Sequence, residues 1–82
     1  MKYSVTLKPK AEKDLKNMMG NDRSRMIDRL KELENNLSGD VKKLTNFDPE
    51  YRMRVGNWRA LFEVEGDKII VYRILQRKDS YS

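Results

Sequence analysis

Apolar and polar residues first alternate along the chain and then repeat every three to four positions. The alternation in Tyr3–Leu7, YSVTL, predicts a first β-strand. From Pro9, which suits the first turn of a helix, the period lengthens and predicts a helix. The apolar positions of this helix are Ala11, Leu15, Met18 and Met19. Gly20 and Asn21 break the pattern and are expected to end the helix.

A second helix is expected from about Asp22, whose side chain can cap its first turn. Its apolar stripe consists of Met26, Ile27, Leu30 and Leu33, and it can extend to Leu37. Ser38 and Gly39 supply the stop signal. Since each helix has one apolar face, the two helices are expected to form a hairpin that covers another surface.

The second half of the chain alternates with the two-residue period of strands. Residues 40–50 are expected to form a loop with at most one short strand. Three strands follow, at Tyr51–Val55, Trp58–Val64 and Lys68–Leu75, and the last is apolar on both sides, as is typical of a central strand. The predicted fold class is α+β, in the order β-α-α-β-β-β, with the helical hairpin packed on one face of a mainly antiparallel sheet.

The turns between these strands decide which side chains share a face. Gly56 and Asn57 predict a two-residue hairpin turn, which sets Arg54 directly opposite Arg59. Between the last two strands, a three-residue turn at Glu65–Asp67 is expected because it gives the cleaner apolar core. The core-facing residues of the last strand would then be Ile70, Tyr72 and Ile74. A two-residue turn would reverse the faces of that strand.

The composition limits the chemistry of the chain. Its 82 residues are enough for a single small domain, spanning residues 1–82. The sequence has no cysteine and no histidine, which removes disulfides, thiolate chemistry and the commonest general base and metal ligand. No metal or cofactor is expected. The N-terminal segment is too polar for a signal peptide and no apolar run approaches membrane length, so a cytoplasmic protein is expected.

Positive charge without balancing acids is concentrated in the predicted hairpin of the second half of the chain. A net charge of +5 favours a polyanionic partner such as nucleic acid, the ribosome or an acidic protein. The segment Tyr51–Arg59, YRMRVGNWR, holds three arginines and no acid. Like charges opposite each other on a sheet are destabilising, and a bound phosphate would relieve the repulsion between Arg54 and Arg59. Guanidinium groups bind phosphate oxygens through paired hydrogen bonds, so this face is expected to bind an anion.

Five arginines are expected on the solvent-facing surface opposite the core. They are Arg52, Arg54, Arg59, Arg73 and Arg77. The alternative is a scatter of surface arginines that pair in part with Glu63 or Asp79.

Other side chains near this face have two interpretations each. Lys42 and Lys43 can lengthen a path for nucleic acid, or can simply be solvated. Tyr81 can stack on an unpaired base, or can dock on the core. Trp58 is expected in the core rather than as a platform for a base.

The segments LKPKAEKDLKNM, KKL, YRMRVGNWRALFEV and IIVYRILQRKDSY together resemble the RelE/ParE toxin superfamily, and above all its RelE branch. The resemblance covers essentially the whole chain, and its most specific parts are the YRxRxGxxR hairpin and the terminal arginine and tyrosine. It implies a RelE-like fold and the toxic half of a toxin–antitoxin pair. Such toxins enter the ribosomal A site and cleave the mRNA there, which inhibits translation. The implied partners are the ribosome, mRNA and a small antitoxin, acidic or partly disordered, in a hetero-oligomer.

The resemblance also implies roles by motif position. Arg52 and Arg54 match residues that grip or activate the RNA, and Arg59 matches the arginine that stabilises the transition-state phosphate. Arg77 matches the proposed general acid, and Tyr81 matches the tyrosine that stacks on or orients the substrate base. The expected catalytic residues are Arg54, Arg59, Arg77 and Tyr81. The expected RNA-binding residues are Lys42, Lys43, Arg52 and Arg73.

Two departures from the family pattern leave the proton transfers open. Gln76 stands where several relatives carry a histidine, and Arg54 stands where a lysine is often assigned as general base. An arginine side chain stays protonated and is a poor base. The proton acceptor can be Tyr81, a ribosomal group or water.

Two other functions are compatible with the same sequence. A ParE-like toxin shares the fold but poisons DNA gyrase without cleaving RNA. The joint presence of Arg54, Arg59, Arg77 and Tyr81 favours the nuclease. The other alternative is a non-catalytic module that binds nucleic acid or antitoxin. It is compatible with Gln76, which stands where several relatives carry a histidine.

Overall fold

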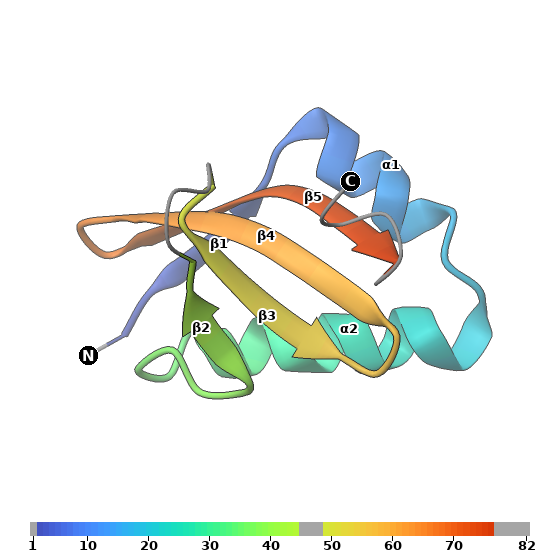
Figure 1. The fold of residues 1–82 in the computed structure, drawn as a ribbon, viewed down its shortest axis with the longest axis horizontal. Coiled ribbons are helices and arrows are strands. Elements are labelled where there is room, and N and C mark those ends of the chain that lie inside the picture. The colour runs from blue at the N-terminus through green and yellow to red at the C-terminus, as the bar shows by residue number, and fades with distance from the viewer. Residues whose placement is uncertain (1, 45–48, 77–82) are drawn as a thin grey trace.

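The computed structural model describes residues 2–44 and 49–76, which form two helices and a five-stranded sheet (Figure 1). In chain order the elements are β1 (Ser4–Leu7), α1 (Pro9–Lys16), α2 (Gly20–Leu33), β2 (Val41–Lys43), β3 (Tyr51–Val55), β4 (Trp58–Glu65) and β5 (Lys68–Gln76). The strand order is β1-β5-β4-β3-β2, with β1 parallel to β5 and the other pairs antiparallel. The α+β class and the interior position of the last strand are confirmed, and β2 is the short strand expected in the loop.

Both helices pack their apolar sides against one face of the sheet, which we call the core face. The buried cluster consists of Ala11, Met18, Met26, Leu30, Leu33, Met53, Val55, Ala60, Phe62, Ile69, Val71 and Ile74. The opposite, outer face of the sheet carries the polar side chains of β3 and β4. Neither helix in the described ranges is long and apolar enough to cross a membrane.

The start of α2 differs from the prediction. The helix begins at Gly20 and has no side-chain cap. Asp22, expected to cap it, accepts a hydrogen bond from the indole N–H of Trp58 at 3.2 Å and so ties the helix to the start of β4. Met19, expected on the apolar face of the first helix, is 82% exposed. The reason is that α1 already ends at Lys16, which leaves Met19 as the N-cap residue of α2.

The β3–β4 hairpin has the predicted register. Gly56 adopts a φ of 59°, in the left-handed region that a two-residue hairpin turn requires and that glycine favours. The turn sets Arg54 directly opposite Arg59, and Val55 opposite Trp58. The outer-face residues of these two strands therefore lie side by side.

The turn between β4 and β5 is shorter than predicted. Glu65 pairs with Lys68, so a two-residue turn joins the strands and the predicted three-residue turn is wrong. Gly66, at a φ of 62°, permits the tighter turn. The faces of the first half of β5 are consequently reversed, and Ile70 and Tyr72 are not core residues.

A β-bulge in β5 then restores part of the predicted pattern. Leu61 pairs with Arg73, whereas the next residue of β4 pairs with Val71, which leaves Tyr72 as the extra residue. The alternation shifts by one position at this point. Ile74 is therefore buried in the core as predicted, and Arg73 shares the outer face with Leu61.

A carboxylate on α1 fastens that helix to the edge of β5. The pairing of β1 with β5 ends at Val71. Beyond it, Asp14 Oδ2 accepts the backbone N–H of Ile74 at 2.9 Å. The same carboxylate accepts hydrogen bonds from Arg73 Nε at 2.7 Å and Nη2 at 3.2 Å. Asp14 thus satisfies a backbone donor of β5 beyond the end of its pairing with β1.

Replacing Asp14 by alanine is expected to lower the free energy of unfolding by about 1–3 kcal/mol, because the Ile74 N–H loses its acceptor. The Arg73 side chain is 41% exposed, so solvent screening leaves its ion pair a small share of this loss. Urea denaturation measures the change. Glu12→Gln, an exposed acid of the same helix, is the control and should have a much smaller effect. Wild-type stability in Asp14→Ala would contradict the fastening role.

Candidate functional site

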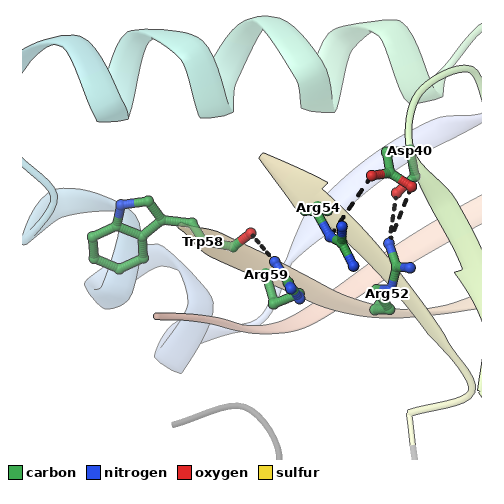
Figure 2. A network of polar contacts seen from close by, with 5 residues as sticks. All are labelled: Asp40, Arg52, Arg54, Trp58 and Arg59. Carbon is green, nitrogen blue, oxygen red and sulfur yellow. Dashed lines mark hydrogen bonds and ion pairs between the residues drawn. The ribbon is translucent and has the colours of Figure 1, made fainter. Parts of the chain in front are cut away.

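Three arginines follow one another on the outer face of the β3–β4 hairpin. Strand alternation turns Arg52 and Arg54 of β3, and Arg59 of β4, away from the core face, and Figure 2 shows them along the two strands. We call these three residues the arginine row. Leu61 pairs with Arg52 on the same face and is buried without belonging to the core cluster. The arginine row therefore has an apolar neighbour.

Two members of the arginine row are buried. Arg59 is 2% exposed and is the largest of the fully buried side chains, and Arg52 is 7% exposed. The expectation that these two lie on a solvent-facing surface is wrong. The side chain of Arg54 is 46% exposed. Within β3, Arg52 pairs with Lys42 of β2, whereas Arg54 lies beyond the last pair of that ladder, Val41 with Met53.

The two buried guanidiniums keep donors without acceptors. The Nε atoms of Arg52 and Arg59 are buried and have no hydrogen-bond partner among the described residues. Nη1 of Arg59 donates to the carbonyl oxygen of Trp58 at 3.4 Å, which is long for such a bond. A buried charged donor without an acceptor is costly and calls for an explanation, such as a bound anion or a catalytic role.

Asp40, which was not among the predicted site residues, contacts two of the arginines (Figure 2). Its Oδ1 accepts a hydrogen bond from Arg52 Nη1 at 3.3 Å, and its backbone carbonyl accepts from the same atom at 3.1 Å. Its Oδ2 lies 3.7 Å from Arg54 Nε, and its carbonyl accepts the Arg54 backbone N–H at 2.9 Å. The pairing of β2 with β3 brings Asp40 to this position. The sequence of residues 40–50 did not show which strand β2 would pair with, so Asp40 was not predicted as a partner of the arginines.

The two lysines of β2 differ in their surroundings. Lys42 is exposed and pairs with Arg52 across the β2–β3 ladder, which places it beside the arginine row. Lys43 forms an exposed ion pair with Glu50 at 3.5 Å. Glu63, weighed as a partner of the arginines, accepts the backbone N–H of Glu50 instead. Lys42 therefore extends the cationic face, whereas the charge of Lys43 is partly offset.

Arg73 shares the outer face by register but is held apart from the arginine row. The hydrogen bonds from Arg73 to the Asp14 carboxylate raise the pKa of its guanidinium. Arg73 lines an open pocket of about 280 Å³ between α1 and β5, together with Lys10, Lys13, Asp14 and Asn17. Its predicted part in RNA binding stays a prediction.

The remaining predicted residues are divided between the described and undescribed parts of the chain. Arg77, Asp79 and Tyr81 lie outside the described residues, so their roles stay predictions. Trp58 is partly buried against the core, as expected. Within the described ranges, no group of three or more His, Cys, Asp or Glu residues is arranged to hold a metal ion.

Comparison with known proteins establishes the class. Residues 5–81 match the family described as ParE toxin of type II toxin–antitoxin system, parDE. The chain is 42% identical over 74 residues to Toxin RelE3 of Methanocaldococcus jannaschii, with 84% of each chain covered. It is 29% identical over 84 residues to Putative toxin RelE1 of the same organism, with 96% of this chain and 93% of that relative covered. The chain therefore belongs to this family of type II toxin–antitoxin toxins.

Solved structures narrow the class to the RelBE type. The chain matches one from the RelB–RelE antitoxin–toxin complex of Methanococcus jannaschii with a TM-score of 0.78 and 40% identity, covering 94% of this chain and 95% of that one. A chain of the archaeal RelE–RelB complex of Pyrococcus horikoshii OT3 has the same fold, with a TM-score of 0.76 at 22% identity, covering 98% of this chain and 100% of that one. The protein is a toxin of a RelBE-type system, and the predicted RelE-like fold is confirmed.

Proposed function

We propose that this toxin is a ribosome-dependent endoribonuclease that cleaves mRNA in the ribosomal A site and thereby inhibits translation. The observation that carries the proposal is the arginine row, where the Nε atoms of two buried guanidiniums have no acceptor among the described residues. A phosphate of the RNA is the acceptor that these donors lack. The 42% identity to Toxin RelE3 supports placing the chain in the RelE branch, for which the resemblance implies cleavage of mRNA.

The chemistry of RNA cleavage suits a site built of arginines. The 2′-OH of the RNA attacks the adjacent phosphorus and gives up its proton to Tyr81, a ribosomal group or water. The bond from phosphorus to the 5′-oxygen breaks as negative charge grows on the phosphate oxygens, and the departing 5′-oxygen takes up a proton. Fixed donors aimed at the growing charge are usually the largest catalytic contribution. In this proposal Arg52 and Arg54 grip the RNA, and Arg59 stabilises the charge. Arg77 protonates the leaving oxygen, and Tyr81 stacks on or orients the base.

Dependence on the ribosome follows from what the chain lacks. It has no histidine, and an arginine cannot accept the proton of the 2′-OH because its guanidinium is already protonated. Alignment of the 2′-OH with the phosphate must therefore supply much of the rate, and correct alignment is worth several orders of magnitude. The ribosome holds the mRNA in one conformation and can provide that alignment.

We expect mRNA on programmed ribosomes to be cleaved at least about a hundredfold faster than the same mRNA free in solution, because only the ribosome aligns it. Primer extension on both substrates measures the two rates. Equal rates on the two substrates would contradict the proposal.

The family description favours a second candidate, a ParE-like poison of DNA gyrase. A gyrase assay distinguishes the two. Accumulation of cleaved DNA, with mRNA on ribosomes left intact, would establish the gyrase poison in place of the nuclease.

The proposed partner is a small antitoxin, acidic or partly disordered when free, that forms a hetero-oligomer with the toxin. Chains similar to this one occur in complexes of RelE with RelB. The exposed cations Arg54 and Lys42 supply a surface that an acidic segment of such a partner would cover.

A further inference from the structure

Asp40 and the arginines that it contacts differ sharply in exposure. The Asp40 side chain is 56% exposed, whereas the Arg52 side chain is 8% exposed. A solvated carboxylate can leave its partners at little cost, because water replaces the lost contacts. For a buried guanidinium, loss of an anionic acceptor is costly unless another anion takes its place. The exposed carboxylate of Asp40 beside the buried guanidinium of Arg52 therefore has the properties of a counter-ion that another anion can replace.

The oxygens of Asp40 occupy positions that suit a phosphate. Oδ1 contacts Arg52 and Oδ2 approaches Arg54, so one carboxylate bridges two guanidiniums. A phosphate offers the same anionic oxygens in a similar spacing. Asp40 makes no hydrogen bond or ion pair with Arg59, whose Nε has no partner among the described residues. Among the described residues, the Asp40 carboxylate therefore contacts two of the three arginines and leaves Arg59 without a counter-ion.

We propose that Asp40 is the positioning residue and internal counter-ion of the arginine row, and that a phosphate of the RNA displaces its carboxylate on binding. The identity of the anion rests on the proposed function. The backbone carbonyl of Asp40 bonds to Arg52 Nη1 at 3.1 Å and to the Arg54 N–H at 2.9 Å. These two bonds stay in place when the carboxylate leaves, so the arginines keep their anchor while they change acceptor.

Two substitutions separate the charge of Asp40 from its geometry. Asp40→Asn keeps an oxygen for Arg52 Nη1 but removes the competing charge, so RNA should bind about threefold to tenfold tighter, with kcat within about twofold of wild type. Asp40→Ala removes the side-chain acceptor of both arginines. It should bind RNA with similarly raised affinity, but kcat should fall about tenfold because the arginines are less well oriented. A lower KM in both variants, with kcat reduced only in the alanine variant, is the expected result.

Binding is measured with a short single-stranded RNA of 2′-O-methyl nucleotides, which lacks the attacking 2′-OH and cannot be cleaved. Fluorescence anisotropy across a salt series gives the affinity and its salt dependence. The slope of log affinity against log salt should steepen by about 0.7 in Asp40→Asn, the value for one further phosphate contact on a single strand. Glu65→Gln, at the far end of β4, changes the net charge equally and should leave the slope unchanged.

Wild-type affinity and slope in Asp40→Asn would overturn the proposal, and so would an equal gain of affinity in Glu65→Gln. The proposed function is tested apart from this, by cleavage of mRNA on ribosomes by the wild-type toxin. If that cleavage is absent, the nuclease assignment fails, whereas tighter binding of the methylated RNA by Asp40→Asn still supports the counter-ion. If neither the wild-type toxin nor any variant binds the methylated RNA, the proposed role of Asp40 as a counter-ion is overturned.

Discussion

Replacing Arg59 by methionine is expected to lower the rate of mRNA cleavage on programmed ribosomes by at least about 10²-fold, the scale for losing one transition-state donor. The same substitution should leave the protein at least as stable as wild type. Arg59 is 2% exposed and its Nε has no acceptor in the described part of the chain, so its burial opposes folding. Methionine keeps most of the buried volume and removes the charge. Loss of activity without loss of stability is typical of a residue retained for its chemistry.

Single-turnover cleavage and urea denaturation measure the two effects separately. Arg29→Met is the control, because Arg29 lies on α2 with half of its side chain exposed, in an ion pair with Glu32. It should change neither the rate nor the stability appreciably. Full activity in Arg59→Met would remove Arg59 from the mechanism. A marked loss of stability would mean instead that the arginine helps to hold the sheet together.

Local pattern was sufficient to predict the β3–β4 hairpin. A two-residue turn between two alternating strands leaves one register, so the opposition of Arg54 and Arg59 follows from neighbouring residues alone. The bounds of β3, Tyr51–Val55, agree with the prediction for the same reason. Where the interactions that decide a structure lie within a few residues, the sequence is enough to predict it.

The faces of β5 depend on residues far away in the chain. Its first four residues pair in parallel with β1, which comes from the other end of the chain. The bulge at Tyr72 comes just after the last paired residue, Val71. Ile70, Val71 and Tyr72 are all suited to either face of a strand, so their alternation alone does not show where an extra residue enters. Neither the length of the β4–β5 turn nor the bulge could be predicted from the alternation of apolar and polar residues.

The acidic partners of the arginines were missed for a related reason. Asp14 lies 59 positions before Arg73, and Asp40 lies 12 positions before Arg52. Packing of α1 against β5, and pairing of β2 with β3, decide these contacts. The burial of Arg59 was missed because arginine is among the residues least often buried. The candidate residues of the hairpin were thus predictable, but their counter-ions and exposure were not.

Association of the toxin with its antitoxin is expected to slow by roughly a hundredfold when salt is raised from about 50 mM to about 1 M, because electrostatic steering accounts for about that span of rates. We expect the antitoxin proposed above to be disordered when free and to wrap the domain. We expect it to lay an acidic stretch near Arg52–Arg59 or to displace Tyr81. Lys42 and the arginine row attract that stretch before contact. Apolar contacts between the antitoxin and the domain should then set a slow dissociation that depends little on salt.

Stopped-flow association across a salt series measures this dependence, and Arg54→Ala shows which surface causes it. Arg54 is the exposed member of the arginine row, with 46% of its side chain open to solvent, so an approaching acidic segment feels its charge first. Its loss should slow association at low salt and flatten the salt dependence, with a smaller effect on dissociation. Arg29→Ala removes an equal charge from α2 and should leave the rates close to wild type, because that arginine is already paired with Glu32. An association rate indifferent to salt and to Arg54 would show that the antitoxin covers a different surface.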